Sequence, residues 1–185
     1  MQTKMLAMFF IALLVGSSSL VAQVAGQFHY PMWESDTAPG CSAPGFKKDQ
    51  YHLDFNTGYN KFHYGEDWNG KCGGNSDLDQ PLRAVADGRI VAIKHEVARG
   101  QGKRLFVRHS FPYVFEEDGL KSVDIVYLHL NRFSSDIREN MPVHRGQKLA
   151  YIGSTGTTTS DPIFAHLHIQ GIWDYENPGQ LENPY

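Results

Sequence analysis

The stretch Ala165-His166-Leu167-His168-Ile169 decides how the chain folds, because its polar and apolar residues alternate. Alternation of this kind predicts a half-buried β-strand. On a strand, residues two apart point to the same face, so His166 and His168 share one face while Leu167 and Ile169 face the core. On an α-helix the same two imidazoles would diverge by about 200°. The stretch therefore predicts two imidazole rings side by side on a strand.

Short alternating segments continue this pattern back along the chain, with turn signals such as Asp87-Gly88 and Gly153 to Gly156 between them. Strands are expected at residues 51–55, 62–67, 82–86, 89–95, 104–109, 123–130, 148–152 and 165–172. The chain shows no long helical periodicity and no internal repeat. These features predict a mainly β fold made of antiparallel strands.

The N-terminus has the features of an export signal. Residues 5–15 form an uninterrupted apolar run after Lys4, and small residues follow at 16–19. The run is too short to span a bilayer, and small residues after it are typical of a cleavage site. We expect a signal peptide at residues 1–22 and a periplasmic or secreted mature protein without an integral membrane segment.

The composition limits the partners that the chain can have. It contains 17 Lys and Arg against 20 Asp and Glu, with a formal net charge of −3 and no basic cluster. Such a chain is not expected to bind nucleic acid. Residues 23–50 are rich in Pro, Gly and Ser without periodicity, which predicts an irregular N-terminal arm. Residues 51–185 then form one domain, long enough to bury a core.

Two cysteines, Cys41 and Cys72, remain after the predicted signal peptide. Export places them in an oxidising compartment, where an even number of cysteines predicts a disulfide bond. The alternative is that Cys72, five residues after Asp67, is a metal ligand. We expect the disulfide, since it accounts for both cysteines without a further assumption.

A second group of polar residues, His63-Tyr64-Gly65-Glu66-Asp67, lies about a hundred residues before the histidine pair. His63 and Asp67 are four apart, so they share a face on a strand or on a helix. Gly65 between them lets the backbone fold closely around a small object. Two imidazoles and one carboxylate are typical of catalytic zinc, which keeps a fourth position for water. Each pair alone is a weak signal, and their combination predicts a metal site.

A further histidine strengthens this prediction. Val123, Ile125, Tyr127 and His129 alternate onto one face of a predicted strand, which places His129 at the strand end. The sequence has no His-Glu-x-x-His motif, whose Glu would act as general base. Another group must therefore handle protons.

The chain resembles the lysostaphin-type (LytM-domain) zinc metallopeptidases, which cut peptidoglycan peptides. The resemblance lies in five segments in the family's order, namely FHYGEDWN (62–69), PLRAVADGRIVA (81–92), YLHL (127–130), VHRGQKLAYIGSTG (143–156) and AHLHIQ (165–170). It implies a compact antiparallel β-sheet domain with an open groove and one Zn²⁺ per chain. By the same resemblance, His63, Asp67 and His168 hold the zinc, and His129 and His166 are unliganded catalytic histidines. The division of roles between these two stays open.

The chain departs from the family pattern at three places. Many family members have Gly-Pro or similar small residues before the histidine pair, where this chain has Pro162-Ile163-Phe164-Ala165. An acidic residue often follows the pair in the family, and this chain has Gln170 there. The connection at residues 111–121 is longer than the minimal domain needs, and we expect it to cover part of the cleft.

We interpret the chain as an exported zinc metalloendopeptidase that hydrolyses peptide bonds in bacterial peptidoglycan cross-links by zinc-activated water. The alternative is a non-catalytic domain of the same fold that binds or activates another cell-wall hydrolase. Such a domain is expected to lack zinc ligands, whereas all five polar groups are present here. Which bond is cut, whose wall is the target and the oligomeric state stay open.

Overall fold

The computed structural model describes residues 28–36, 41–43, 45–57, 60–98, 100–115, 120–156 and 163–173. Within them, the structure is almost entirely antiparallel β-sheet, and the one helical element is a 3₁₀ turn, η1 (Glu34–Asp36). The prediction of a mainly β fold is confirmed. The predicted signal peptide lies outside the described residues. Among those residues, no helix has the length and apolar character needed to cross a membrane.

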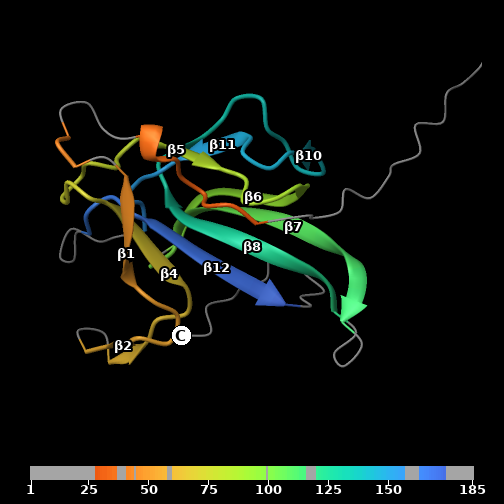
Figure 1. Cartoon of the computed structure of the whole chain (residues 1–185), viewed down its shortest axis with the longest axis horizontal. Helices are drawn as coiled ribbons and strands as arrows, with labels where there is room; N and C mark the ends of the chain where they lie inside the picture. The colour runs from red at the N-terminus through yellow and green to blue at the C-terminus, as the bar shows by residue number, and fades with distance from the viewer. Residues whose placement is uncertain are drawn as a thin grey trace, which may run out of the picture.

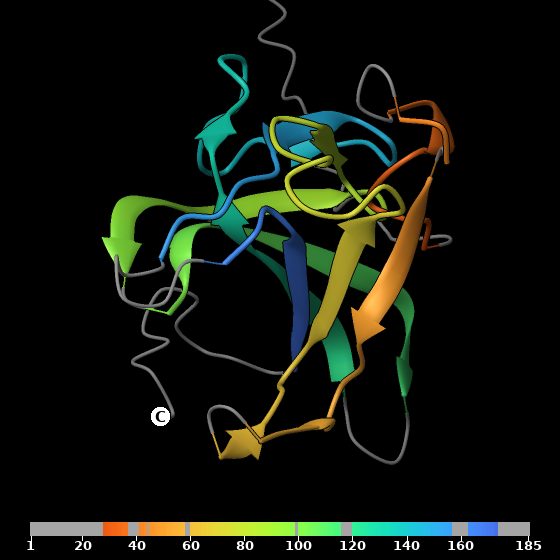
Figure 2. The same cartoon turned by 90° about the vertical axis from the view of Figure 1, so that its left-hand side faces the viewer.

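A seven-stranded sheet forms the body of the domain (Figure 1), and all neighbouring strands in it are antiparallel. Its strands, in spatial order, are β1 (Phe46–Gln50), β4 (Glu66–Gly70), β12 (Leu167–Trp173), β8 (Leu120–Leu130), β7 (Gly102–Phe115), β6 (Gly88–Ala98) and β10 (Pro142–Val143). A three-stranded sheet has the order β5 (Pro81–Arg83), β11 (Lys148–Tyr151) and β9 (Arg132–Phe133). Strands β2 (Phe55–Asn56) and β3 (Lys61–Phe62) form a small hairpin that projects beyond β1 and β4 (Figure 2).

The main core lies between the seven-stranded and the three-stranded sheets. Leu105, Tyr127 and Leu167 of the large sheet pack in one cluster with Leu82 and Leu149 of the small one, and all five are fully buried. Burying an apolar side chain of this size contributes roughly 1.5–3 kcal/mol. A smaller cluster that includes Val126 and Leu128 packs separately. The alternation along β8 therefore distributes its side chains between the two faces of the sheet.

Strand β12 confirms the prediction for the histidine-containing stretch. Leu167 is fully buried in the main core, and Ile169 packs against the same core. In register, His168 lies opposite Asp67 of β4 on one side and Leu128 of β8 on the other. The side chain of His168 therefore emerges on the face opposite the main core, in the middle of the sheet.

Three expectations about strands and loops were wrong. Residues 46–50 of the predicted irregular arm form β1, whose polar sequence FKKDQ suits an edge strand and lacks an apolar signal. Of the strand expected at 51–55, only Phe55 lies in a strand, namely β2 (Phe55–Asn56). Residues 111–115 and 120–121 extend the β7–β8 hairpin, with Phe115 opposite Leu120. The described parts of this hairpin pair at the end of β8 opposite to His129, not over the histidines, and residues 116–119 lie outside the described residues.

The N-terminal arm is fixed to the domain at several points. The guanidinium of Arg83 lies 3.9 Å from the ring centre of Trp33 and forms a bidentate ion pair with Asp36. Cys41 and Cys72 are joined in a disulfide with a Cα–Cα distance of 5.8 Å. The alternative role of Cys72 as a metal ligand is therefore wrong, since its sulfur is already bonded.

Candidate metal centre

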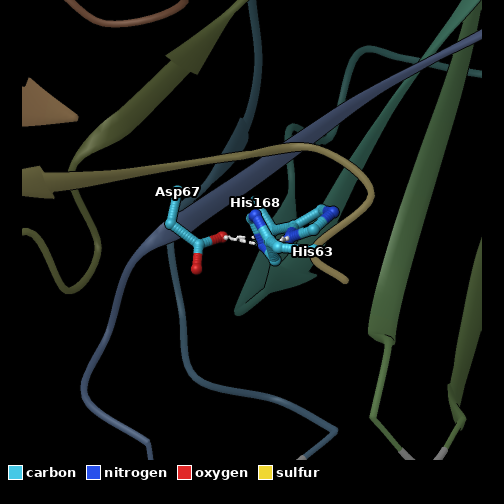
Figure 3. A group of neighbouring side chains, drawn as sticks. All are labelled: His63, Asp67 and His168. Atoms are coloured by element: carbon cyan, nitrogen blue, oxygen red, sulfur yellow. Dashed lines mark hydrogen bonds and ion pairs between the residues drawn. The ribbon is translucent and has the colours of Figure 1, made fainter. Parts of the chain in front are cut away.

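His63, Asp67 and His168 converge on one point of the face opposite the main core (Figure 3). His63 Nε2 lies 2.9 Å from His168 Nδ1, and His168 Nδ1 lies 2.9 Å from Asp67 Oδ1. His63 Nε2 is 3.2 Å from the same Asp67 oxygen. The two ring nitrogens and the carboxylate oxygen thus form a nearly equilateral triangle.

The size of this triangle fits a zinc ion. Zinc lies about 2.0–2.1 Å from imidazole nitrogen and about 2.0–2.2 Å from carboxylate oxygen. In a tetrahedral site these bond lengths place the ligand atoms roughly 3.3–3.5 Å from one another, a few tenths of an ångström more than the triangle observed. The three side chains could hold a metal ion and leave one tetrahedral position open.

Local hydrogen bonds direct the His63 ring toward the centre. Its backbone pairs with the residues before the hairpin, because His63 N donates to Asp54 O and His63 O accepts from Leu53 N. Its ring Nδ1 lies 3.4 Å from the carbonyl oxygen of Tyr51. A carbonyl can only accept, so Nδ1 carries a hydrogen, and when the ring is neutral its Nε2 lone pair is the one that faces the triangle.

The charges of the triangle suit a cation. Burial alone would raise the pKa of the Asp67 carboxyl, but hydrogen bonds from His168 and His63 hold that pKa far below its usual range. Burial likewise opposes the charge on His63, and the hydrogen bond and negative charge of Asp67 outweigh it, so the pKa of His63 is raised. Asp67 is therefore an anion at neutral pH, as a metal-binding carboxylate must be.

The structure brings His129 and His166 to the same place. Their ring centroids are 4.7 Å apart, and His166 Nε2 lies 3.6 Å from Asp67 Oδ1. His166 Nδ1 bonds to the carbonyl of Phe164 at 2.9 Å, and His129 Nδ1 bonds to the carbonyl of Thr155 at 2.9 Å. Both rings therefore carry their hydrogen on Nδ1 when neutral, and both offer a lone pair on Nε2.

His129 is held in its neutral form. Burial, and to a lesser degree the nearby charge of His166, lowers the pKa of His129 to about 3. A neutral ring whose single hydrogen is bonded to Thr155 has no hydrogen left to donate into the site. His129 can therefore accept a hydrogen bond at Nε2, and it cannot donate one there.

The backbone of His129 departs from the expected alternation. Its φ is 60°, in the left-handed region that non-glycine residues rarely adopt. Regular alternation would place it on the core face with Tyr127, yet its ring meets those of His166 and His168 on the opposite face. The expectation that His129 shares a face with Tyr127 was wrong, because the alternation rule holds only for extended backbone.

Two partners of the site were not predicted from the sequence. The carbonyl oxygens of Thr155 and Phe164 fix the two catalytic candidates, but every residue has such a carbonyl, so no sequence signal marks them. Thr155 is itself fixed, because its hydroxyl donates to Leu130 O at 2.9 Å and accepts from Lys103 N at 3.0 Å.

An antiparallel sheet with a His-Asp-His group and two further histidines on one face defines a metallopeptidase type of domain. Residues 61–178 match the model of peptidase family M23, and the chain belongs to that family. The resemblance seen in the five sequence segments is thereby confirmed.

Two curated relatives show where similar sequences occur. An uncharacterized metalloprotease of Haemophilus influenzae is 29% identical over 91 residues, covering 49% of this chain and 16% of the relative. The murein hydrolase activator NlpD of Escherichia coli is 32% identical over 94 residues, covering 48% of this chain and 21% of the relative. The chain thus matches less than a quarter of the length of either relative.

Solved structures share the fold. A zinc-containing peptidase from Vibrio cholerae superposes with a TM-score of 0.55 at 19% identity, over 80% of this chain and 37% of that one. The catalytic domain of lysostaphin from Staphylococcus simulans gives 0.52 at 23% identity, over 71% of this chain and 84% of that one. These likenesses confirm the lysostaphin-like architecture expected from the sequence.

Proposed function

We propose that this protein is an exported zinc metalloendopeptidase that hydrolyses peptide bonds in peptidoglycan cross-links. One Zn²⁺ per chain would be held by His63, Asp67 and His168. The observation that carries the proposal is the completeness of the site, because three ligand atoms lie within 3.2 Å of one another and two more histidines face them. Membership of family M23 and similarity to a murein hydrolase activator support peptidoglycan as the substrate.

Bound zinc would supply a Lewis acid that polarises the scissile carbonyl and activates water. The chain's own residues supply the proton transfer. His166 accepts a proton at Nε2 while its Nδ1–H stays bonded to the Phe164 carbonyl. It then returns that proton to the leaving amine, as a general base that becomes a general acid.

The structure supports a different role for His129. Its Nε2 lone pair can accept the second hydrogen of the attacking water and so orient that water. Donation to a developing oxyanion would require a protonated ring, which burial disfavours in His129. We therefore assign proton transfer to His166 and water orientation to His129.

A second candidate function is activation of another cell-wall hydrolase without catalysis. The specific observation in its favour is the 32% identity to the Escherichia coli activator. A non-catalytic domain has no need for a ligand triangle with two oriented histidines beside it, so we rank this function second.

The test is digestion of purified peptidoglycan that contains either direct or glycine-bridged cross-links, with product masses measured. The zinc-loaded protein should release cross-link fragments from one of the two substrates, and His168→Ala should release none. If neither protein cuts, but both accelerate an added wall hydrolase equally, the activator function is correct and the peptidase function is wrong.

A further inference from the structure

The loop at residues 71–80, between β4 and β5, contacts the start of β12. Asn75 Oδ1 accepts a hydrogen bond from the backbone N–H of Ala165 at 2.8 Å. Since the donor is an N–H group, the atom that faces it is the amide oxygen of Asn75. Ala165 is fully buried, and a buried N–H group without a partner is costly. Asn75 therefore satisfies a donor directly beside His166.

The same peptide unit orients the His166 ring. The carbonyl of Phe164 and the N–H of Ala165 belong to one peptide bond, which is planar and directs the two groups in opposite directions. The carbonyl accepts the hydrogen bond from His166 Nδ1 at 2.9 Å. Asn75 thus binds the N–H end of the Phe164–Ala165 peptide plane, and the His166 ring binds its carbonyl end.

We propose that Asn75 is a positioning residue for His166 and acts through the Phe164–Ala165 peptide unit. The inference rests on the proposed function, in which His166 moves the proton. Without an acceptor at residue 75, the peptide plane loses the bond that fixes its N–H end, and its carbonyl no longer holds the Nδ1–H of His166 in one direction. The Nε2 lone pair then no longer faces the reacting water in a single tautomer.

The loop is itself anchored, so Asn75 is a fixed support. Cys72 ties the loop to Cys41 of the N-terminal arm. At its other end, Asp79 N donates to Ile152 O at 2.9 Å, and Gln80 O accepts from Ile152 N at 3.0 Å. These bonds hold the loop on both sides of Asn75 and leave its side chain aimed at β12.

The test compares three variants of the zinc-loaded protein. Asn75→Leu keeps the branched shape but removes the acceptor, and Asn75→Asp keeps an acceptor oxygen in the same place. Asn131→Leu is the matched control, because it removes an exposed hydrogen bond from Asn131 Nδ2 to Asp79 Oδ1 (2.8 Å) and leaves the backbone bonds to Ile152 and the peptide plane intact. For each variant we would measure kcat and KM on a cross-linked peptide, zinc content, and the ring ¹⁵N chemical shifts of His166.

We expect Asn75→Leu to lower kcat about ten- to a hundredfold, as for other residues that orient a functional histidine, with KM and zinc content unchanged. The ¹⁵N shifts should show His166 exchanging between tautomers. Asn75→Asp should restore a single tautomer and most of kcat, and Asn131→Leu should resemble the unaltered protein. Unchanged His166 shifts in Asn75→Leu, or an equal kcat loss in Asn131→Leu, would overturn the proposal. If the unaltered protein cuts nothing, the proposed function fails, and the His166 shifts still decide the role of Asn75.

Discussion

Gly65 lies against His168 so closely that no side chain fits between them. A Cβ atom on Gly65 would stand 2.8 Å from His168 Cε1 and 2.7 Å from the carbonyl oxygen of Ile169. The chain between His63 and Asp67 can approach β12 this closely only because residue 65 is glycine. Two of the three candidate ligands thus depend on this contact for their distance from the third.

Gly65→Ala should therefore weaken zinc binding by at least about tenfold, since a methyl group must displace the His168 ring or the strand beneath it. Gly171→Ala on the same strand is the control. Its Cβ would lie 3.7 Å from Val123 and 3.8 Å from Ile125, which are ordinary contacts. Zinc titration of both variants checks the prediction, and equal affinities would contradict it.

His166→Ala and His168→Ala should separate catalyst from ligand. His166→Ala keeps the ligand triangle, so it should retain zinc and lose about 10²–10⁴-fold in activity, as expected for a general acid–base group. His168→Ala removes one corner of the triangle and should lose both zinc and activity. Zinc content measured beside peptide hydrolysis checks both variants. A metal-free His166→Ala protein would show that the roles are assigned wrongly.

Asp77 should make the fold less stable at neutral pH than at acid pH. Burial raises the pKa of its carboxyl from 3.8 to about 6, although Gly70 N donates to Oδ2. Among the described residues, its Oδ1 has no hydrogen-bond partner. Because the folded pKa exceeds the unfolded one, stability is lost as the pH rises from about 4 through 6, by about 3 kcal/mol in total.

Asp77→Asn removes this titration and should raise the free energy of unfolding by up to about 3 kcal/mol at pH 7.5 and by nothing below pH 4. Asp124→Asn is the contrasting control, since Asp124 is buried but forms a bidentate ion pair with Arg108. That variant should be destabilised. Urea unfolding at both pH values measures the difference, and an Asp77→Asn protein that is less stable at pH 7.5 would exclude this explanation.

The disulfide should contribute about 3–4 kcal/mol to stability, because it closes a loop between cysteines 31 positions apart. A Cys41→Ser, Cys72→Ser double variant should unfold at correspondingly lower urea concentration. Reductant should destabilise the unaltered protein to the same level and leave the double variant unchanged. A reductant effect on the double variant would mean that the loss has another cause.

The parts of the fold that follow from side-chain alternation were predictable from the sequence. Strand β12 was predicted because Leu167 and Ile169 alternate with two histidines, and the seven-stranded sheet buries one side of it. The edge strand β1 was missed because its residues are mostly polar and its pairing with β4 is a long-range contact. Alternation of apolar and polar residues reveals a strand that buries one face, and the edge strand β1 buries little of either face.

The candidate site shows the same division. Residue type and spacing indicated a metal site near His63, Asp67 and the pair His166 and His168, and the family resemblance then implied which histidines would bind metal. The left-handed backbone of His129 was not predicted, since nothing in the local sequence requires a positive φ there. That conformation is imposed by tertiary contacts, including the hydrogen bond from His129 N to Gln101 O at 3.0 Å.

The place of β12 in the sheet governs when the metal centre can exist during synthesis. Strands β4 and β8 pair with β12 and not with each other. A chain that ends before residue 163 lacks the strand between β4 and β8, so the edges of both strands have no partner there. His63 and His168 are 105 positions apart, so the second imidazole is added only with this strand. Incomplete chains released by the ribosome cannot assemble the metal centre.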